Sequence, residues 1–343
     1  MKSFGFQWHL TDRCNLRCQH CYQERFDAAQ ERPLPDLVAM ARAIANAIPD
    51  RAISINLTGG EPFLFEGLWP LLDSLDELEN VEEYHIITNG TRARGEALHR
   101  LHGRKKLAGL KISLEGPDAD TNDAVRGPGN FAEVLQNLRA LTVLQKPLHL
   151  MATLDRQNLE SIPALVELVR EEALDGVILE RFVPLGRGRR RAGAVLDAAG
   201  WRRVIELVTR SVGIEAEAHE LASYHAFWLR PGDEAEPLRG ARCNLGEESM
   251  ALMPDGTVFP CRRLPLPLGR LPETSFVKIL DRLSAFEPAR LRSRLTGTTC
   301  RACEVLGCAG CRALALAIHG DPYADDPRCP LAIAPAAKIH DSL

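Results

Sequence analysis

The chain has 343 residues, of which 45% are hydrophobic, and a formal net charge of −4. This length exceeds one typical domain, so we expect a large domain and a smaller one. The acidic balance lacks the basic surplus of nucleic-acid-binding proteins, so we predict no nucleic-acid partner. No apolar run reaches about 18 residues and no secretory signal opens the sequence, which predicts a cytoplasmic protein without a membrane partner.

Short β-rich runs alternate with helical patterns up to about residue 190, which predicts βα units around a parallel sheet. The expected strands are 4–11, 52–58, 83–88, 109–114, 148–154 and 176–183. The expected helices are 35–48, 67–78, 94–101, 131–144 and 158–171. Six such units predict an α/β fold, a partial (β/α)6 TIM-like barrel that is open on one side and admits a large substrate.

Ten cysteines in a chain without a secretion signal are not expected to form disulfides. Their grouping predicts two metal-binding regions that flank a core without metal. Three lie near the N-terminus and seven in the last third: Cys14, Cys18, Cys21, Cys243, Cys261, Cys300, Cys303, Cys308, Cys311 and Cys329.

The first three cysteines, Cys14, Cys18 and Cys21, follow the first expected strand with the spacing C-x3-C-x2-C. They therefore lie at the end of the barrel where such enzymes place their chemistry. Three thiolates leave a four-coordinate site one ligand short, so an iron–sulfur cluster held this way has one open iron. The alternative is a set of structural or zinc-binding cysteines.

This motif, with Tyr22 directly after it, resembles the signature of radical S-adenosylmethionine (SAM) enzymes. The resemblance implies that the open iron binds the amino and carboxylate groups of the methionine part of SAM. Gly59-Gly60-Glu61, after the second expected strand, resembles the motif that holds the methionine amino group in this family. Ser113 and Glu115, after the fourth, lie where the family binds the ribose hydroxyls and the carboxylate.

Two further positions carry weaker signals. Arg126 matches an arginine that pairs with the methionine carboxylate in similar proteins, although an arginine on a solvated loop is the alternative. Thr88-Asn89-Gly90 is either part of the site or a plain turn at the end of a strand.

A run of five arginines lies between Arg181 and Arg191 in this acidic chain. It predicts either contact with an acidic partner or a solvated loop. A helix is expected near 201–212, followed by Tyr224, His225, Phe227 and Trp228, for which core packing is favoured over lining a substrate channel.

The cysteine-rich tail begins at Cys243 and contains a predicted β-hairpin with an Asp255-Gly256 turn. Four residues between Cys303 and Cys308 are too few for a zinc ribbon, and the density of cysteines favours ferredoxin-type clusters.

The tail resembles the SPASM domain of some radical SAM enzymes, although two of its spacers are one residue shorter than in the family. The resemblance implies that Cys243, Cys261 and Cys311 hold a first auxiliary cluster, without a fourth cysteine. It assigns Cys300, Cys303, Cys308 and Cys329 to a second. We therefore expect three [4Fe–4S] clusters. We divide the chain into a barrel (1–195), a bridge (196–240) and a SPASM domain (241–343).

The resemblance implies reductive cleavage of SAM to a 5′-deoxyadenosyl radical that abstracts hydrogen from a peptide or protein, as in RiPP-type maturases. The alternatives are modification of tetrapyrrole or haem side chains, maturation of formylglycine in sulfatases, and, outside enzymes, an iron–sulfur electron carrier. Formylglycine maturases place an acid after the second tail cysteine, whereas this chain has Arg262.

Electrons are expected from a flavodoxin- or ferredoxin-type donor. Only thirteen residues precede Cys14, so we expect leader recognition, if any, to come from a separate protein or from the barrel.

Overall fold

The computed structural model describes residues 3–247 and 249–332. Their strands form one sheet in the order β11-β10-β9-β1-β2-β3-β4-β5-β6-β7-β8. The strands are β1 Ser3–His9, β2 Ala52–Thr58, β3 Val81–Thr88, β4 Leu107–Ser113, β5 Leu148–Leu154, β6 Gly176–Arg181, β7 Tyr224–Leu229, β8 Leu238–Arg242, β9 Ala251–Leu252, β10 Thr257–Phe259 and β11 Gly269–Arg270.

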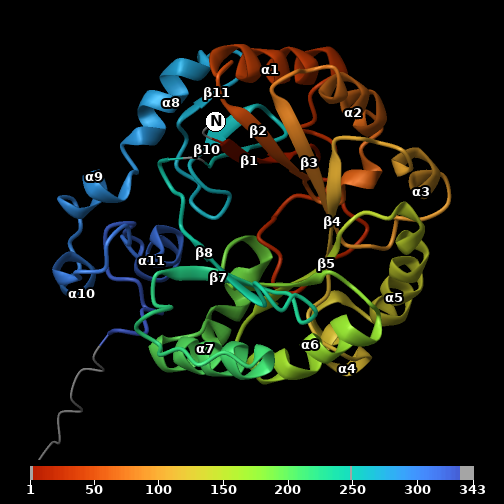
Figure 1. Cartoon of the computed structure of the whole chain (residues 1–343). Helices are drawn as coiled ribbons and strands as arrows, with labels where there is room; N and C mark the ends of the chain where they lie inside the picture. Colours follow the sequence, from red (N-terminus) through yellow and green to blue (C-terminus); the bar gives the residue numbers. More distant parts are fainter. Residues whose placement is uncertain (1–2, 248, 333–343) are drawn as a thin grey trace, which may run out of the picture.

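Helices surround the outside of this sheet (Figure 1). They are α1 Leu34–Ala47, α2 Leu68–Asp76, α3 Glu96–Leu101, α4 Ala119–Arg126, α5 Asn130–Leu141, α6 Ile162–Glu171, α7 Ala198–Val212, α8 Phe276–Ser284, α9 Pro288–Arg292, α10 Thr298–Ala302 and α11 Arg312–His319.

Strands β1 to β6 run parallel, each paired with the next, and a helix follows each of β1 to β6 along the chain. The predicted partial barrel is therefore confirmed. Because the strands are parallel, the loops after their carboxyl ends gather at one end of the barrel.

Alternation along the strands explains the layering. In β1, Phe4, Phe6 and Trp8 are at most 2% exposed and pack in the core beneath the helices. Gln7 lies between them in the strand and lines a cavity inside the barrel. Side chains alternate across a strand, so one face serves the core and the other serves the site.

The structure contains elements that the sequence did not predict. Helix α4 was not expected; Asp118 caps it by accepting a hydrogen bond from the Thr121 amide at 2.8 Å. The region after the α7 helix forms β7, which pairs antiparallel with β6, and β8, which pairs antiparallel with β7, so both extend the sheet. Phe227 is fully buried and stacks on Trp201 at 5.7 Å between ring centroids, so its predicted core role is confirmed.

The tail is joined to the barrel at the opposite edge of the sheet. The expected hairpin forms from β9 and β10, and Gly256 in its turn has φ +87°. Strand β9 also pairs in parallel with β1. The sheet therefore continues across the division that we drew at residue 241, and the domain limits stay a prediction.

The barrel interior contains a buried cation. Lys111 on β4 is 8% exposed, donates a hydrogen bond to Asn56 Oδ1 at 2.6 Å and lies 5.0 Å from the centre of the Trp228 ring. Burial lowers the pKa of Lys111 to about 8.

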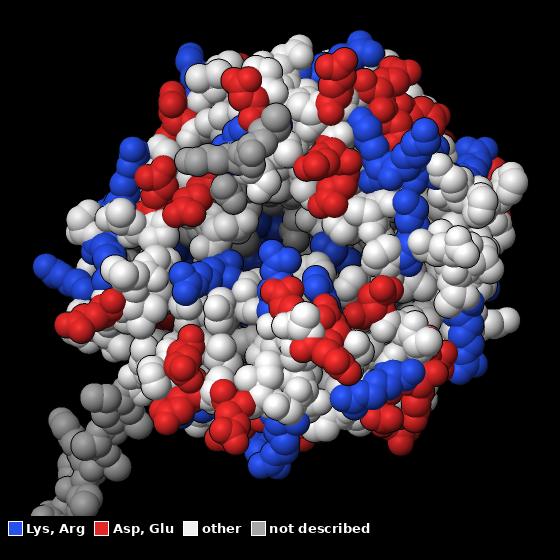
Figure 2. Space-filling model, viewed as in Figure 1, with Lys and Arg blue, Asp and Glu red and all other residues white. Residues whose placement is uncertain are grey.

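Figure 2 shows a face of the molecule with a central hollow in which Lys and Arg side chains are visible. Acidic and basic side chains alternate over the rest of this face. In the described part of the chain, none of the helices has the length and apolar character needed to cross a membrane.

Candidate SAM and iron–sulfur sites

A cavity lies at the carboxyl ends of the barrel strands. Its walls come from the loop after β1, from the ends of the other parallel strands and from the tail. The residues that line it are Gln7, Cys14, Leu16, Cys18, His20, Cys21, Tyr22, Gln23, Thr58, Gly59, Gly60, Ile87, Thr88, Asn89, Ser113, Arg126, Met151, Thr153, Arg181, Phe182, Val183, Arg262 and Arg263.

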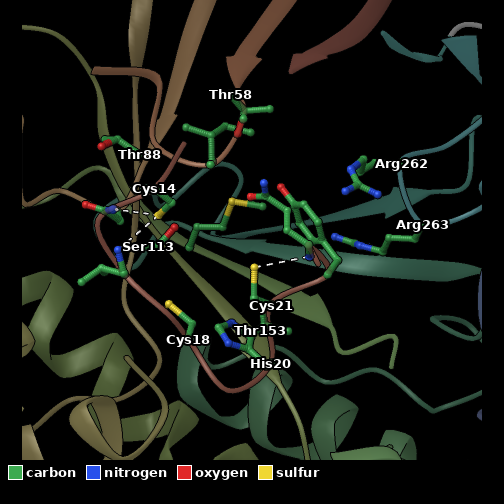
Figure 3. Close-up of a pocket in the computed structure, with 18 of the residues that line it drawn as sticks. Cys14, Cys18, His20, Cys21, Thr58, Thr88, Ser113, Thr153, Arg262 and Arg263 are labelled. Atoms are coloured by element: carbon green, nitrogen blue, oxygen red, sulfur yellow. Dashed lines mark hydrogen bonds between the residues drawn. The ribbon is translucent and has the colours of Figure 1, made fainter. Parts of the chain in front are cut away.

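The first three cysteines lie together in this cavity, where Figure 3 shows their sulfur atoms turned toward a common space. Backbone amides of Leu16 and Gln23 donate to the sulfurs of Cys14 and Cys21, each at 3.4 Å. Such N–H···S contacts stabilise the negative charge of cluster thiolates. The donor set therefore fits an iron–sulfur cluster held by three cysteines.

The same sulfurs receive two side-chain donors. Asn89 Nδ2 lies 3.7 Å from the Cys14 sulfur, and Arg126 Nη1 lies 3.8 Å from the Cys18 sulfur. Burial raises the pKa of all three thiols, to about 11 for Cys14. A bound iron cation reverses this preference, because metal ligation deprotonates a thiol.

Gly59 and Gly60 line the cavity where the loop after β2 lies against the loop after β1. A Cβ on Gly60 would lie 2.2 Å from the Arg13 carbonyl oxygen, and a Cβ on Gly59, whose φ is +150°, would lie 2.5 Å from the Thr11 carbonyl. Only glycine fits here, and the exposed backbone can approach a ligand closely.

Glu61 does not line the cavity. Its carboxylate is fully buried and accepts hydrogen bonds from Thr88 Oγ1 and from the Asn89 amide, both at 2.8 Å. Burial raises the pKa of Glu61 to about 7. Glu61 thus ties the end of β2 to the end of β3, and its predicted contact with the methionine amino group stays a prediction.

Glu115 is buried at the centre of a charged network. Its carboxylate pairs with Arg126 Nη2 at 2.5 Å and with His20 Nε2 at 3.1 Å, and it accepts from the Thr153 amide at 2.7 Å. Burial alone would raise the pKa of Glu115, but His20 and Arg126 outweigh it and lower this pKa to about 2. Its partners lie within the protein, and Glu115 does not itself line the cavity.

Of the predicted SAM-binding residues, five line the cavity and two support its wall. Tyr22, Gly59, Gly60, Ser113 and Arg126 line it, whereas Glu61 and Glu115 lie behind. The structure brings all seven to one end of the barrel.

Several lining residues had no role in our sequence interpretation, notably His20, Gln23 and Thr153. His20 carried a signal, because it lies inside the cysteine motif.

The tail brings together a second set of cysteines. Cys300, Cys303, Cys308 and Cys329 line a smaller cavity together with His225, Gly310, Asp326 and Arg328. Amides of Asp326 and Gly310 donate to the sulfurs of Cys300 and Cys308 at 3.3 and 3.4 Å. This set fits the cluster that the resemblance assigned to these four cysteines.

The remaining cysteines, Cys243, Cys261 and Cys311, belong to one apolar cluster between the barrel and the tail. The pKa of Cys243 is raised to about 12, mainly by burial; Arg181 opposes this shift, and Cys311 and Cys261 add to it as charged neighbours. These three are thus near one another, as a common cluster requires.

The arginine run after β6 divides into two groups. Arg181 lines the cavity, whereas Arg189 pairs with Glu24 at 2.9 Å and Arg191 pairs with Asp155 at 2.5 Å. Arg189 and Arg191 are therefore bound by carboxylates of their own chain.

Comparison with known proteins identifies the family of this chain. A family model for the radical SAM superfamily matches residues 8–169, and one for the SPASM iron–sulfur cluster-binding domain matches residues 243–304. The PqqA peptide cyclase of Ruegeria pomeroyi is 30% identical over 330 residues, which cover 93% of this chain and 85% of that protein. The chain belongs to the radical SAM superfamily. It is an enzyme that binds SAM and a [4Fe–4S] cluster, and its SPASM domain binds auxiliary clusters.

Other relatives act on different substrates. The AdoMet-dependent heme synthase of Nitratidesulfovibrio vulgaris is 28% identical over 348 residues, 94% of this chain and 90% of that protein. The fold resembles the crystal structure of Streptococcus suis SuiB bound to its precursor peptide SuiA, with a TM-score of 0.70, 20% identity, and coverage of 96% of this chain and 76% of SuiB.

Proposed function

We propose that this radical SAM enzyme modifies a peptide or protein after translation, as RiPP-type maturases do. The observation that carries the proposal is the single cavity that connects the N-terminal cysteines with the residues after the tail cysteine Cys261. The similarity to a peptide cyclase supports the substrate class. An electron carrier has no use for such a cavity, so we set that alternative aside.

The residues divide into roles along the cavity. Cys14, Cys18 and Cys21 hold the cluster, and the backbone at Gly59-Gly60 with Ser113, Arg126 and Tyr22 binds SAM. When bound, SAM and the reduced cluster supply a 5′-deoxyadenosyl radical that takes a hydrogen atom from the substrate. Glu61 and Glu115 fix the loops that carry these groups, because their carboxylates cross-link adjacent strand ends.

The substrate occupies the part of the cavity toward the tail, lined by Met151, Phe182, Val183 and the arginines at 181, 262 and 263. Apolar side chains here exclude water from a reactive radical, and the arginines orient a polar group. We further propose a flavodoxin- or ferredoxin-type protein as electron donor.

Modification of a tetrapyrrole is the second candidate. It is favoured by the three arginines in the part of the cavity toward the tail, which suit propionate groups, and by the similarity to heme synthases. Formylglycine maturation ranks lower, because Arg262 stands in place of the acid.

One experiment separates the two candidates. The reconstituted, reduced enzyme is incubated with SAM and either short peptides encoded beside its gene or coproporphyrin III, and products are identified by mass spectrometry. A mass change in a peptide, with equimolar 5′-deoxyadenosine, supports the proposal. A product from the porphyrin alone, with all peptides unchanged, replaces it with the second candidate.

A further inference from the structure

Arg262 is a cation of the substrate cavity that forms no ion pair with a carboxylate of the described residues. It follows Cys261 directly and lines the cavity. Its guanidinium carbon lies 4.3 Å from the centre of the Tyr22 ring, and its buried Nε has no hydrogen-bond partner. Among residues 3–247 and 249–332, no carboxylate forms an ion pair with it.

The neighbouring arginines differ in this respect. Arg263 Nη2 pairs with Glu180 Oε2 at 2.6 Å. Arg181 donates to the Cys311 sulfur at 3.1 Å and to the His225 carbonyl oxygen at 2.9 Å. Both are therefore held by groups of the protein, whereas the stacked Arg262 is not.

Asp12 is an acidic residue whose charge interacts with that of Arg262, but the two side chains form no ion pair. The Asp12 carboxylate accepts a hydrogen bond from Gln23 Nε2 at 3.2 Å instead. The N–H groups of Arg262 are therefore not bound by Asp12.

We propose that Arg262 binds a carboxylate of the substrate beside the carbon that loses hydrogen. This inference rests on the proposed function and names the chemical class of the substrate group. Stacking on Tyr22 fixes the plane of the guanidinium, and its N–H edges then form a two-pronged donor for one carboxylate. The side chain is half-buried and its buried Nε has no partner, and burying such a donor without a partner is costly, so an anionic ligand that accepts from it is favoured.

The location of Arg262 supports the role. Tyr22 follows the cluster ligand Cys21, and Arg262 follows the tail ligand Cys261, so the stacked pair lies between the two predicted cluster sites. Figure 3 shows Arg262 and Arg263 reaching into the cavity from the side opposite Cys14 and Ser113. A carboxylate bound there would hold the adjacent carbon within the cavity that SAM shares.

The test measures equilibrium binding to the oxidised, cluster-loaded enzyme with SAM present. The peptide probes are two fluorescein-labelled decapeptide pools that are randomised except for a central Glu or a central Gln. The porphyrin probes are coproporphyrin III and its tetramethyl ester. Iron content and the visible spectrum are recorded for each variant, because Arg262 adjoins Cys261.

We expect at least one carboxylate probe to bind about 10-fold tighter than its neutral counterpart, as loss of a charge-assisted pair predicts. Arg262→Gln should remove this preference, and Arg262→Lys should retain part of it. Arg210→Gln, on the exposed surface of α7, is the matched control and should keep the full preference.

Equal affinity of carboxylate and neutral probes for the parent enzyme, absence of binding by both carboxylate probes, or a preference that survives in a cluster-loaded Arg262→Gln enzyme would overturn the assignment. If Arg262→Gln loads no clusters, Arg262→Lys decides, because an unchanged preference there would count against a two-pronged contact. A preference seen only with the porphyrin keeps the carboxylate site and rejects the peptide substrate.

Discussion

Arg181, the last residue of β6, donates a hydrogen bond from Nε to the sulfur of Cys311 at 3.1 Å, although 130 positions separate them. The same guanidinium binds the carbonyl oxygen of His225, whose side chain lines the cavity of the other tail cysteines. One buried cation therefore connects the two predicted auxiliary cluster sites with the barrel.

Replacing Arg181 should change the potential of the cluster that Cys311 holds. Without the cation and its N–H···S bond the reduced, more negative cluster is less stable, so Arg181→Gln should lower its reduction potential by about 60 mV or more. Redox titration followed by electron paramagnetic resonance would measure the shift, with Arg210→Gln as control. An unchanged potential would place the cluster away from Cys311.

The N-terminal cysteines should be required only for SAM cleavage. Replacing Cys14, Cys18 and Cys21 with Ala should abolish 5′-deoxyadenosine formation and reduce the iron content from about 12 to about 8 per chain, counting four irons per cluster. Chromatography of the nucleoside and an iron assay would check both. Cleavage at the parent rate would contradict the assignment of the radical site.

Arg126 should stabilise the protein as well as the site. Arg126→Met leaves the buried Glu115 carboxylate with His20 as its remaining side-chain partner. Breaking a buried pair in this way costs about 3 kcal/mol or more, so the melting temperature should fall even without SAM. Arg126→Met with Glu115→Gln should recover part of the loss. If Arg126→Met alone is as stable as the parent, the Arg126–Glu115 ion pair does not contribute to stability.

Lys111 should make stability depend on pH. Its pKa is lowered to about 8 in the folded protein, against about 10.4 when unfolded. The unfolded chain therefore binds more protons between these values, and the cost of burying the cation is complete below pH 8 and disappears as the pH rises toward 10.

Lys111→Met removes this cost but leaves Asn56 Oδ1 without its donor. We expect a net gain of about 1 kcal/mol at pH 7.5, seen as a higher melting temperature that approaches the parent value by pH 9.5. A difference in melting temperature between Lys111→Met and the parent that does not vary with pH would show that burial does not lower the pKa of Lys111.

The sequence predicted the location of those parts of the site that belong to recognisable motifs. The cysteine spacing and Gly59-Gly60 were correctly assigned to one end of a partial barrel, because parallel strands align their carboxyl ends. The positions of Glu61 and Glu115 were not predictable, since their carboxylates are bound by partners on other elements. The Asn89 amide after β3 donates to Glu61, and Arg126 at the end of α4 pairs with Glu115.

Distant contacts also decided which arginines face the cavity. Arg189 and Arg191 lie in a basic run, yet Glu24 and Asp155, 165 and 36 positions away, bind them. Arg262 lies in no such run and reaches the cavity because β9 aligns the tail with β1. These contacts join residues far apart in the sequence, so local sequence patterns could not predict them.

The pairing of β9 with β1 and of β7 with β6 has a consequence for any attempt to isolate the barrel. Both outer strands of the parallel sheet are covered by chain that follows residue 195. A fragment that ended there would expose two rows of unpaired N–H and C=O groups, which act as templates for pairing with other chains. The chain after residue 195 therefore protects the barrel against aggregation, in addition to supplying the cysteines of the auxiliary clusters.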